Sequence, residues 1–470
     1  MSPITRRVRL GLLAGLAGGA LASVAAQDQA AWKPLAQDWP QWRGPGSAAV
    51  APAGTLPTRW SATDQLAWRA PLAGPGTSSP IVVGDRVIVT SQLGRTPVAS
   101  GAPQLARDDK ALAVRERVIG GAADAAAGAA ADAAAGAAAA GDEVTLVVEA
   151  FHRGDGRRLW QHRTRAVGPF TELHEKHNLA TPTPVSDGER VYAWFGTGQL
   201  VALDLQGRQL WTRHLAETYG PFDGQWGHGS SPARYRDLII LLCDRRSNAV
   251  LVALDAKTGK ERWTAPRGSG RVSHSTPVVV PGPQGDELLV NSSARIDAYD
   301  PATGQLLWHM GSERQTPIPS AVFHDGRIFL TRGYRNSDVL AIRPGGRGDV
   351  TATHVAWTAP NGGSYVPSLV HYDGLIYLTN EIGIVSCLDA ATGERVWRHR
   401  LGAVFFASPV AGDGKVYFVS ETGETFVLKA GRTPEVLATN DLGERFLASP
   451  AIAGGRLFLR SDRTLFAVGG

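Results

Sequence analysis

Short apolar runs separated by turn residues repeat along most of the chain. The runs at 238–242, 328–330 and 416–419 consist of leucine and of branched or aromatic residues, which is typical of short β-strands. An Asp-Gly or Gly-Asp turn stands beside many of them. No long stretch has the apolar periodicity of an amphipathic helix. The pattern therefore predicts an all-β protein.

A tryptophan recurs behind these runs at positions 160, 211, 263, 308, 357 and 397, in steps of 51, 52, 45, 49 and 40 residues. Most of these residues end a phrase that starts with an acidic residue and contains Gly, as in Asp255 to Trp263. The Asp can accept backbone N–H groups and the Gly can adopt positive φ, so each phrase predicts a hairpin. Strand units of this period are typical of a propeller. We expect the tryptophans to be packing residues between sheets.

A second marker counts the units. A Ser or Thr, followed by Pro in six cases, opens each unit just before an apolar run. It occurs eight times, at Ser79, Thr183, Ser231, Thr276, Ser320, Ser368, Ser408 and Ser449. Eight copies indicate an architectural role, because an activated serine needs a base and an acid in register with it.

The last unit begins at Phe446 and has room for only about three strands before Gly470. The segment 64–72 resembles a tryptophan-bearing strand but has no preceding repeat of its own. We expect it to complete the last blade and so close the ring without a free sheet edge. The predicted fold is an eight-bladed β-propeller of four-stranded antiparallel blades. In the seventh unit, Leu437 stands where the tryptophan is expected.

The N-terminal region has a different composition. Residues 1–26 carry Arg6, Arg7 and Arg9 before an apolar stretch and end in small residues, which predicts a cleaved export signal, with Sec and twin-arginine export both open. No other stretch approaches the roughly 20 apolar residues of a membrane span. Residues 27–59 form a predicted extension that packs across the ring through Trp39 and Trp42. The expected location is periplasmic or secreted.

The propeller is predicted to occupy residues 60–470, with an Ala- and Gly-rich insertion at 97–142. The insertion has no apolar face, so we expect a disordered loop, with a partner-docking arm as the alternative. The net charge of +5 falls to +2 when the three arginines of the signal are removed, which does not favour nucleic-acid binding. Cys243 and Cys387 stand in apolar runs, and burial is favoured over a disulfide.

The repeated phrase resembles that of the pyrroloquinoline-quinone (PQQ) repeat family, Ala-x-Asp-x-x-Thr-Gly-x-x-x-Trp, as at 253–263 and 298–308. The resemblance covers about 60–470 and implies the propeller fold. The family includes periplasmic quinoprotein dehydrogenases and a non-enzymatic lipoprotein that scaffolds outer-membrane barrel assembly. The dehydrogenases have adjacent cysteines and a calcium site of Glu, Asn and Asp, whereas this chain has no adjacent cysteines and no constellation that we can match. It also lacks the lipidated cysteine of the scaffold.

One group of polar residues is not explained by blade building. His177 and Asn178 precede the second unit, Trp226 and His228 the third, and His274 the fourth. Loops that enter the innermost strands share one face of a propeller, so these side chains are expected near one channel mouth, where neutral imidazoles can bind a ligand. The alternative is that each histidine bonds to carbonyl groups of a neighbouring blade. The spacing predicts no metal site.

Arg332 and Tyr334, after a second strand, complete the predicted ligand site; no catalytic residue is predicted. The leading hypothesis is an exported, monomeric, non-catalytic scaffold or binding protein whose envelope partner or small ligand binds at this mouth, without a cofactor. The first alternative is a quinoprotein oxidoreductase that uses PQQ with calcium. The second is a small-ligand or carbohydrate binding module that uses His228, His274 and Arg332.

Overall fold

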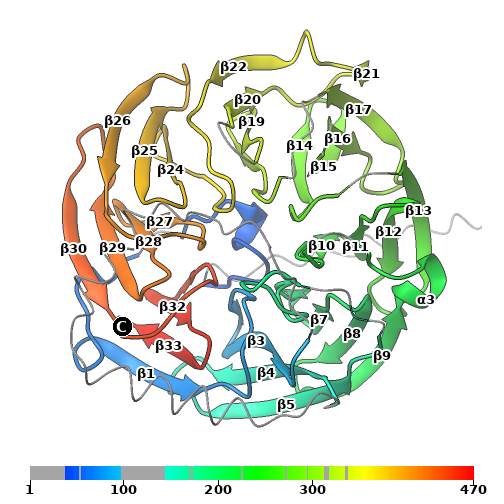
Figure 1. Ribbon diagram of the computed structural model, residues 1–470, viewed down its shortest axis with the longest axis horizontal. Coiled ribbons are helices and arrows are strands. Elements are labelled where there is room, and N and C mark those ends of the chain that lie inside the picture. The colour runs from blue at the N-terminus through cyan, green and yellow to red at the C-terminus, as the bar shows by residue number, and fades with distance from the viewer. Residues whose placement is uncertain are drawn as a thin grey trace, which may run out of the picture. The chain divides into compact units, whose positions relative to one another are not determined.

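The computed structural model describes residues 37–51, 54–96, 143–168, 170, 173–223, 226–269, 272–293, 295–311, 317–333 and 337–470. All of them belong to one unit, Pro34–Gly470. The predicted signal at 1–26 and the insertion at 97–142 lie outside these residues. Figure 1 shows eight sheets arranged around a central axis, which confirms the predicted propeller.

Each blade has four antiparallel strands, which follow one another from the axis outward. Blade 1 consists of β2 (Ile81–Val83), β3 (Arg86–Leu93), β4 (Thr145–His152) and β5 (Arg158–Arg165), and blade 2 of β6 (Val185–Ser186), β7 (Arg190–Trp194), β8 (Gln199–Asp204) and β9 (Gln209–His214). Blade 3 consists of β10 (Ala233–Tyr235), β11 (Leu238–Cys243), β12 (Ala249–Asp255) and β13 (Glu261–Gly268), and blade 4 of β14 (Val278–Gly282), β15 (Gly285–Ser292), β16 (Arg295–Tyr299) and β17 (Leu306–Gly311). The short strand β21 (Gly348–Asp349) adds to blade 4 in parallel with β17.

Blade 5 consists of β18 (Val322–His324), β19 (Arg327–Thr331), β20 (Val339–Ile342) and β22 (Val355–Ala359), and blade 6 of β23 (Val370–Tyr372), β24 (Leu375–Thr379), β25 (Ile384–Asp389) and β26 (Arg395–Arg400). Blade 7 consists of β27 (Val410–Gly412), β28 (Lys415–Val419), β29 (Glu424–Lys429) and β30 (Val436–Asp441), and blade 8 of β31 (Ala451–Ala453), β32 (Arg456–Arg460), β33 (Thr464–Val468) and β1 (Leu66–Pro71). Two short helices are η1 (Pro45–Ser47) and α3 (Leu215–Tyr219). None of the helices among the described residues is long and apolar enough to cross a membrane.

The ring is closed by the two ends of the propeller chain, as predicted. Strand β1 pairs antiparallel with β33, with Ala70 opposite Leu465 and Trp68 opposite Ala467. This pairing gives blade 8 its outer strand, and it joins N-terminal and C-terminal residues in one sheet (Figure 1).

Tryptophans join neighbouring blades, as predicted. The Trp211 ring of blade 2 lies against Gly259 in the hairpin of blade 3, where a Cβ would come within 2.6 Å of the ring. Its indole N–H donates to the Ala256 carbonyl at 3.2 Å. Trp68, Trp160, Trp357 and Trp397 likewise donate to carbonyls of the following blade. The hairpin glycine therefore serves two needs, positive φ and close approach of a ring.

Blade 7 obtains its tryptophan from elsewhere in the chain. The register places Ala438, not Leu437 as expected, at the position that Trp397 occupies in blade 6. Trp60 packs near this position, with its ring centroid 6.4 Å from that of Tyr417. The equivalent pair in blade 6, Tyr377 and Trp397, is separated by 6.0 Å. A period search along the sequence misses Trp60 because this residue lies outside the repeats.

The N-terminal extension crosses the ends of the innermost strands (Figure 1, blue). Trp39 exchanges two 2.8 Å backbone hydrogen bonds with Val82 of blade 1. Pro40 accepts one from Ser186 of blade 2 at 2.9 Å, and Val50 bridges Ala411 of blade 7. The segment thus spans the channel at the end where β2, β6 and β27 finish.

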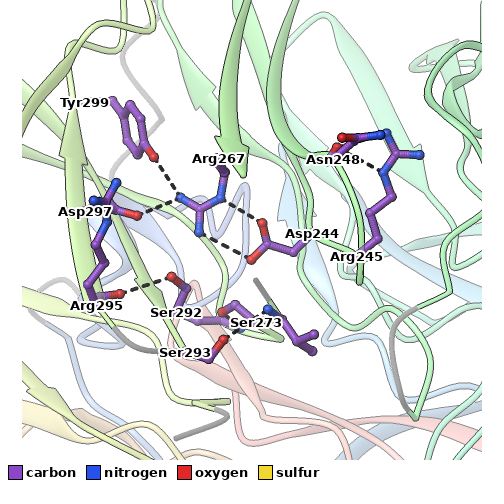
Figure 2. A network of polar contacts seen from close by, with 12 residues as sticks. Asp244, Arg245, Asn248, Arg267, Ser273, Ser292, Ser293, Arg295, Asp297 and Tyr299 are labelled. Carbon is purple, nitrogen blue, oxygen red and sulfur yellow. Dashed lines mark hydrogen bonds and ion pairs between the residues drawn. The ribbon is translucent and has the colours of Figure 1, made fainter. Parts of the chain in front are cut away.

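A buried ion-pair network joins blades 3 and 4 (Figure 2). Arg267 donates to both carboxylate oxygens of Asp244, at 2.7 and 3.3 Å, and to Asp297 and the Tyr299 hydroxyl across the blade boundary, at 3.1 and 3.0 Å. The side chains of Arg267 and Asp297 are fully buried. Burial alone would lower the pKa of Arg267, but the two carboxylates and Tyr299 outweigh burial and raise it. The guanidinium is therefore charged at every ordinary pH.

Substitution of Gly259 tests the contact between tryptophan and glycine. We expect Gly259→Ala to lower the free energy of unfolding by about 2 kcal/mol more than Gly326→Ala, since only the first places a methyl group against a ring. Gly326 has a similar positive φ, +71° against +67°, with no atom near its would-be Cβ. Urea unfolding measures both. Equal losses of unfolding free energy would show that the cost comes from the positive φ alone and that the tryptophan contact adds nothing.

Substitution of Arg267 tests the network. Arg267→Met takes the cation from buried Asp244 and leaves Asp297 paired with Arg295 alone, so it should cost about 3–5 kcal/mol of unfolding free energy. Arg262→Met is the control, because Arg262 is half-exposed in its pairs with Asp237 and Asp255, and should cost at most about 1 kcal/mol. Comparable losses in denaturant unfolding would contradict the assignment.

Candidate functional site

The opening Ser and Thr residues of the blades form a ring of hydrogen bonds around the channel. The backbone N–H of each donates to the side-chain oxygen of the next: the Ser79 amide donates to Thr183 Oγ1 at 2.9 Å and the Thr183 amide to Ser231 Oγ at 2.9 Å. The series continues through Thr276, Ser320, Ser368 and Ser408 to Ser449, at 2.8–3.0 Å. These seven bonds couple blades 1 to 8 in order at their first residues, and the ring is interrupted between blades 8 and 1, where Ser79 Oγ has no partner among the described residues.

A cavity of about 210 Å³ lies on the axis, and its lining includes all of these residues except Ser79. Trp42 of the N-terminal extension contributes to the lining. The remaining lining residues are mostly apolar or aromatic and include Trp226, Tyr365, Phe406 and Leu447. The loops that lead into the innermost strands contribute many of these side chains, so the cavity opens on the face that carries them. We call this the mouth face.

Three of the predicted site residues meet in this cavity: His177, Trp226 and His274 all contribute to its lining. The ring of His177 is held on one side by Thr181, whose hydroxyl contacts Nδ1. On the other side, the ring packs on the backbone at Gly227 and Gly229. Two loops from neighbouring blades therefore fix its orientation.

The other predicted residues are placed differently. His228 is not among the lining residues; it is buried behind them, with its ring centroid 5.0 Å from Phe222 and 5.7 Å from Trp194. Asn178 stabilises its own turn, with Oδ1 accepting the Ala180 amide at 2.9 Å. Arg332 is also outside the lining. Tyr334 lies outside the described residues.

Burial keeps the imidazoles neutral. Burial, followed by the neighbouring His274, His228 and His174, lowers the pKa of His177 to about 3. Burial and His274 lower the pKa of His228 to about 3, and burial with His174 lowers that of His274 to about 4. The cluster therefore adds no positive charge to the cavity at neutral pH.

Sequence reasoning missed an ion pair at the mouth. Lys176 Nζ lies 2.7 Å from Glu421 and 3.8 Å from the centroid of the Phe406 ring. Arg445 also pairs with Glu421, at 2.9 Å. Lys176 follows His174 in the second unit and Glu421 stands in the seventh, so only the closed ring brings them together. In the sequence, Glu421 could have been recognised only by its position just after the second strand of its unit, which is the position that Arg332 has in the fifth unit.

The lining does not fit PQQ with calcium. Calcium requires several carboxylate or carbonyl oxygens, but the lining residues that the structure describes include no Asp, Glu, Asn or Gln. Among the described residues, no group of three or more His, Cys, Asp or Glu side chains is placed to hold a metal ion. Cys243 and Cys387 are free and buried in blades 3 and 6, so the prediction of burial is confirmed.

The lowered pKa values predict acid sensitivity. Between about pH 6.5 and pH 3, the unfolded chain binds protons on these histidines that the folded chain does not bind, so unfolding free energy should fall as pH decreases through this range. We expect His228→Gln to reduce the slope of unfolding free energy against pH by about one proton. Urea unfolding at several pH values measures the slope. An unchanged slope would contradict the burial of a neutral His228.

Comparison with known proteins places the chain among PQQ-repeat propellers. The family described as outer membrane protein assembly factor BamB matches residues 145–399 and 381–469. The BamB protein of Yersinia pestis is 22% identical over 323 residues, 66% of this chain and 66% of that protein. Tetrathionate hydrolase of Acidithiobacillus ferrooxidans is 23% identical over 302 residues, 58% of this chain and 53% of that protein. The matches thus leave a third or more of each relative uncovered.

Structural similarity extends to an enzyme of another kind. A quinohemoprotein alcohol dehydrogenase from Pseudomonas putida has a TM-score of 0.60 at 13% identity, covering 92% of this chain and 80% of that chain. Identity this low shows the fold alone. The family match, in contrast, covers more than half of the sequence and includes the repeated phrase that joins the blades. This chain belongs to the BamB family of PQQ-repeat β-propellers.

Proposed function

We propose that this protein is a non-catalytic scaffold of the cell envelope that binds a protein partner on its mouth face. The observation that carries the proposal is the unequal loop length on the two faces. On the mouth face, the connections into the innermost strands are long, such as 166–184 and 220–232. On the opposite face, the first two strands of a blade are joined by two-residue turns, such as 84–85 and 373–374. Binding residues are concentrated on loops that a rigid scaffold positions.

The chemistry of the mouth supports binding rather than catalysis. The side chains of Trp226, Tyr365 and Phe406 provide aromatic surface, which is enriched among the residues that dominate binding energy. Lys176, Glu421 and Arg445 surround this surface with paired charges. His177 contacts Thr181, but the Thr181 hydroxyl donates to the Asn178 carbonyl, so this pair does not form an activated nucleophile.

The family relationship supports a role in the envelope. The relative from Yersinia pestis is named an outer membrane protein assembly factor. We extend that role to this chain as a scaffold for assembling envelope proteins, in accordance with the predicted export signal. The PQQ-dependent alternative lacks fitting ligands in the lining, and the carbohydrate alternative loses His228 and Arg332 from the cavity.

Site-specific photocrosslinking in cells tests the proposed face. A photoreactive amino acid at Glu175, an exposed position beside the mouth, should yield a discrete protein adduct. The same amino acid at Lys257, an exposed turn on the opposite face, is the matched control and should yield little or none. Adducts are measured by gel shift and mass spectrometry of the envelope fraction. Equal adducts at both positions, or none at Glu175, would overturn the proposal.

A further inference from the structure

The hydroxyl ring has unused hydrogen-bonding capacity. A hydroxyl group can donate one hydrogen bond and accept two. Each of the seven lining oxygens accepts one backbone N–H. Within the part of the chain that the structure describes, none of the seven donates its hydrogen to a protein acceptor. The seven residues are Thr183, Ser231, Thr276, Ser320, Ser368, Ser408 and Ser449.

These seven residues are buried at the wall of the cavity. Ser368 is 1% exposed and Thr276, the most exposed of the seven, is 6% exposed, yet all seven contribute to the cavity lining. An oxygen that accepts an N–H is polarised and becomes a better donor through its own hydrogen. Seven residues whose hydroxyl hydrogens have no protein acceptor among the described residues therefore line one small space. A buried donor without an acceptor is costly, and a bound group that supplies acceptors can replace the solvent at these hydroxyls.

The charge of the lining selects the kind of acceptor. Among the described residues of the lining there is no carboxylate, and Lys176 is the one Lys or Arg. His177 and His274 are neutral because burial lowers their pKa values. An anionic oxygen group therefore meets several donors and no negative charge. Hydrogen bonds to an ionised acceptor are about twice as strong as neutral ones.

The walls and the volume select the rest of the ligand. Above the hydroxyls, the lining includes Trp226, Tyr365, Phe406, Ile318 and Leu447, which favour an apolar or aromatic body. The volume of about 210 Å³ is below the roughly 300–1,000 Å³ of drug-sized pockets. The ligand is therefore small, with one anionic end.

We propose that the cavity binds a small organic carboxylate, with its oxygens on the hydroxyl ring and an aromatic or short aliphatic body against the aromatic walls. This site goes beyond the scaffold role, because the carboxylate lies on the hydroxyl ring inside the channel. The ligand's body contacts aromatic residues that also belong to the proposed partner surface, so ligand binding is measured on the isolated protein, where it does not depend on a partner. The ring hydroxyls thus have two uses, accepting the N–H of one blade and donating to the ligand.

A ligand series on the full-length protein tests the proposal. Phenylacetate should produce a saturable change in tryptophan fluorescence, since Trp42 and Trp226 both line the cavity. Phenylacetamide, which has the same body without the charge, should bind at least about tenfold more weakly. Inorganic phosphate, which lacks the apolar body, should also bind more weakly. Equal affinity for the acid and the amide, or no saturation by phenylacetate, would overturn the proposal.

Ring variants test the site by affinity rather than by stability. Ser368→Ala and Ser408→Ala each remove one donor and should weaken phenylacetate binding by about tenfold. Both also leave one amide N–H unpaired, so a lower melting temperature alone would not count as support. Ser79→Ala is the matched control, because Ser79 opens blade 1 in the same way, but its Oγ neither lines the cavity nor has a partner among the described residues.

The phenylacetate affinities of the three variants together test whether the hydroxyl ring binds the carboxylate. A tenfold loss in the two lining variants with an unchanged Ser79→Ala protein supports the ring as the carboxylate site. An equal loss in all three, or unchanged affinity in the two lining variants, would overturn it. If a lining variant fails to fold, the comparison of phenylacetate with phenylacetamide on the unmodified protein still decides whether the cavity selects an anion.

Discussion

The pairing of β1 with β33 is the constraint on which the rest of the structure depends. Strands near the two ends of the chain become neighbours in blade 8, and only then do the innermost strands of all eight blades surround one axis. The junction carries an additional tie. Arg460, which is 1% exposed, donates to Ser78 Oγ at 2.8 Å and to Ser91 Oγ at 3.2 Å, joining blade 8 to blade 1. The series of Ser/Thr hydrogen bonds runs from Ser79 to Ser449 and does not close, since Ser79 Oγ accepts no amide N–H among the described residues. The Arg460 bonds lie at this same boundary between blades 8 and 1. At the boundary of blades 8 and 1, where the chain closes the propeller, hydrogen bonds from Arg460 therefore stand in place of the Ser/Thr hydrogen bond of the other boundaries.

Contacts between blades are made by a few residue types at fixed places. At the rim, a tryptophan lies on the hairpin glycine of the next blade, and near the axis a hydroxyl accepts the amide of its neighbour. Both contacts run in one direction around the ring, so each blade needs the following one. The network of Arg267 adds an ionic contact at the boundary of blades 3 and 4 only (Figure 2). Repetition therefore provides the common geometry, and single residues strengthen individual boundaries.

The sequence predicted the blades well because their contacts are local and periodic. The phrase from Asp255 to Trp263 encodes a hairpin and its packing residue together, and the opening Ser or Thr encodes the start of each blade. The sequence did not predict contacts between distant repeats. Trp60 fills a place in blade 7 from outside the repeats, and Lys176 meets Glu421 across most of the chain. The histidines were predicted from loop position, which places loops on a face but does not orient side chains. For that reason His177 and His274 reach the cavity while His228 packs behind it.

The lining of the channel distinguishes functions that the fold leaves open. An assembly factor, a hydrolase and an alcohol dehydrogenase all resemble this chain, so the propeller itself selects none of their activities. In the described part of this chain, the first residues of the blades provide hydroxyl oxygens rather than carboxylates to the ring around the axis, and seven of the eight accept an amide N–H. Among the described residues, this lining gives a cation no carboxylate ligand, whereas each hydroxyl keeps its hydrogen to donate. In the site that we propose, the hydroxyls that join the blades therefore also donate to the ligand.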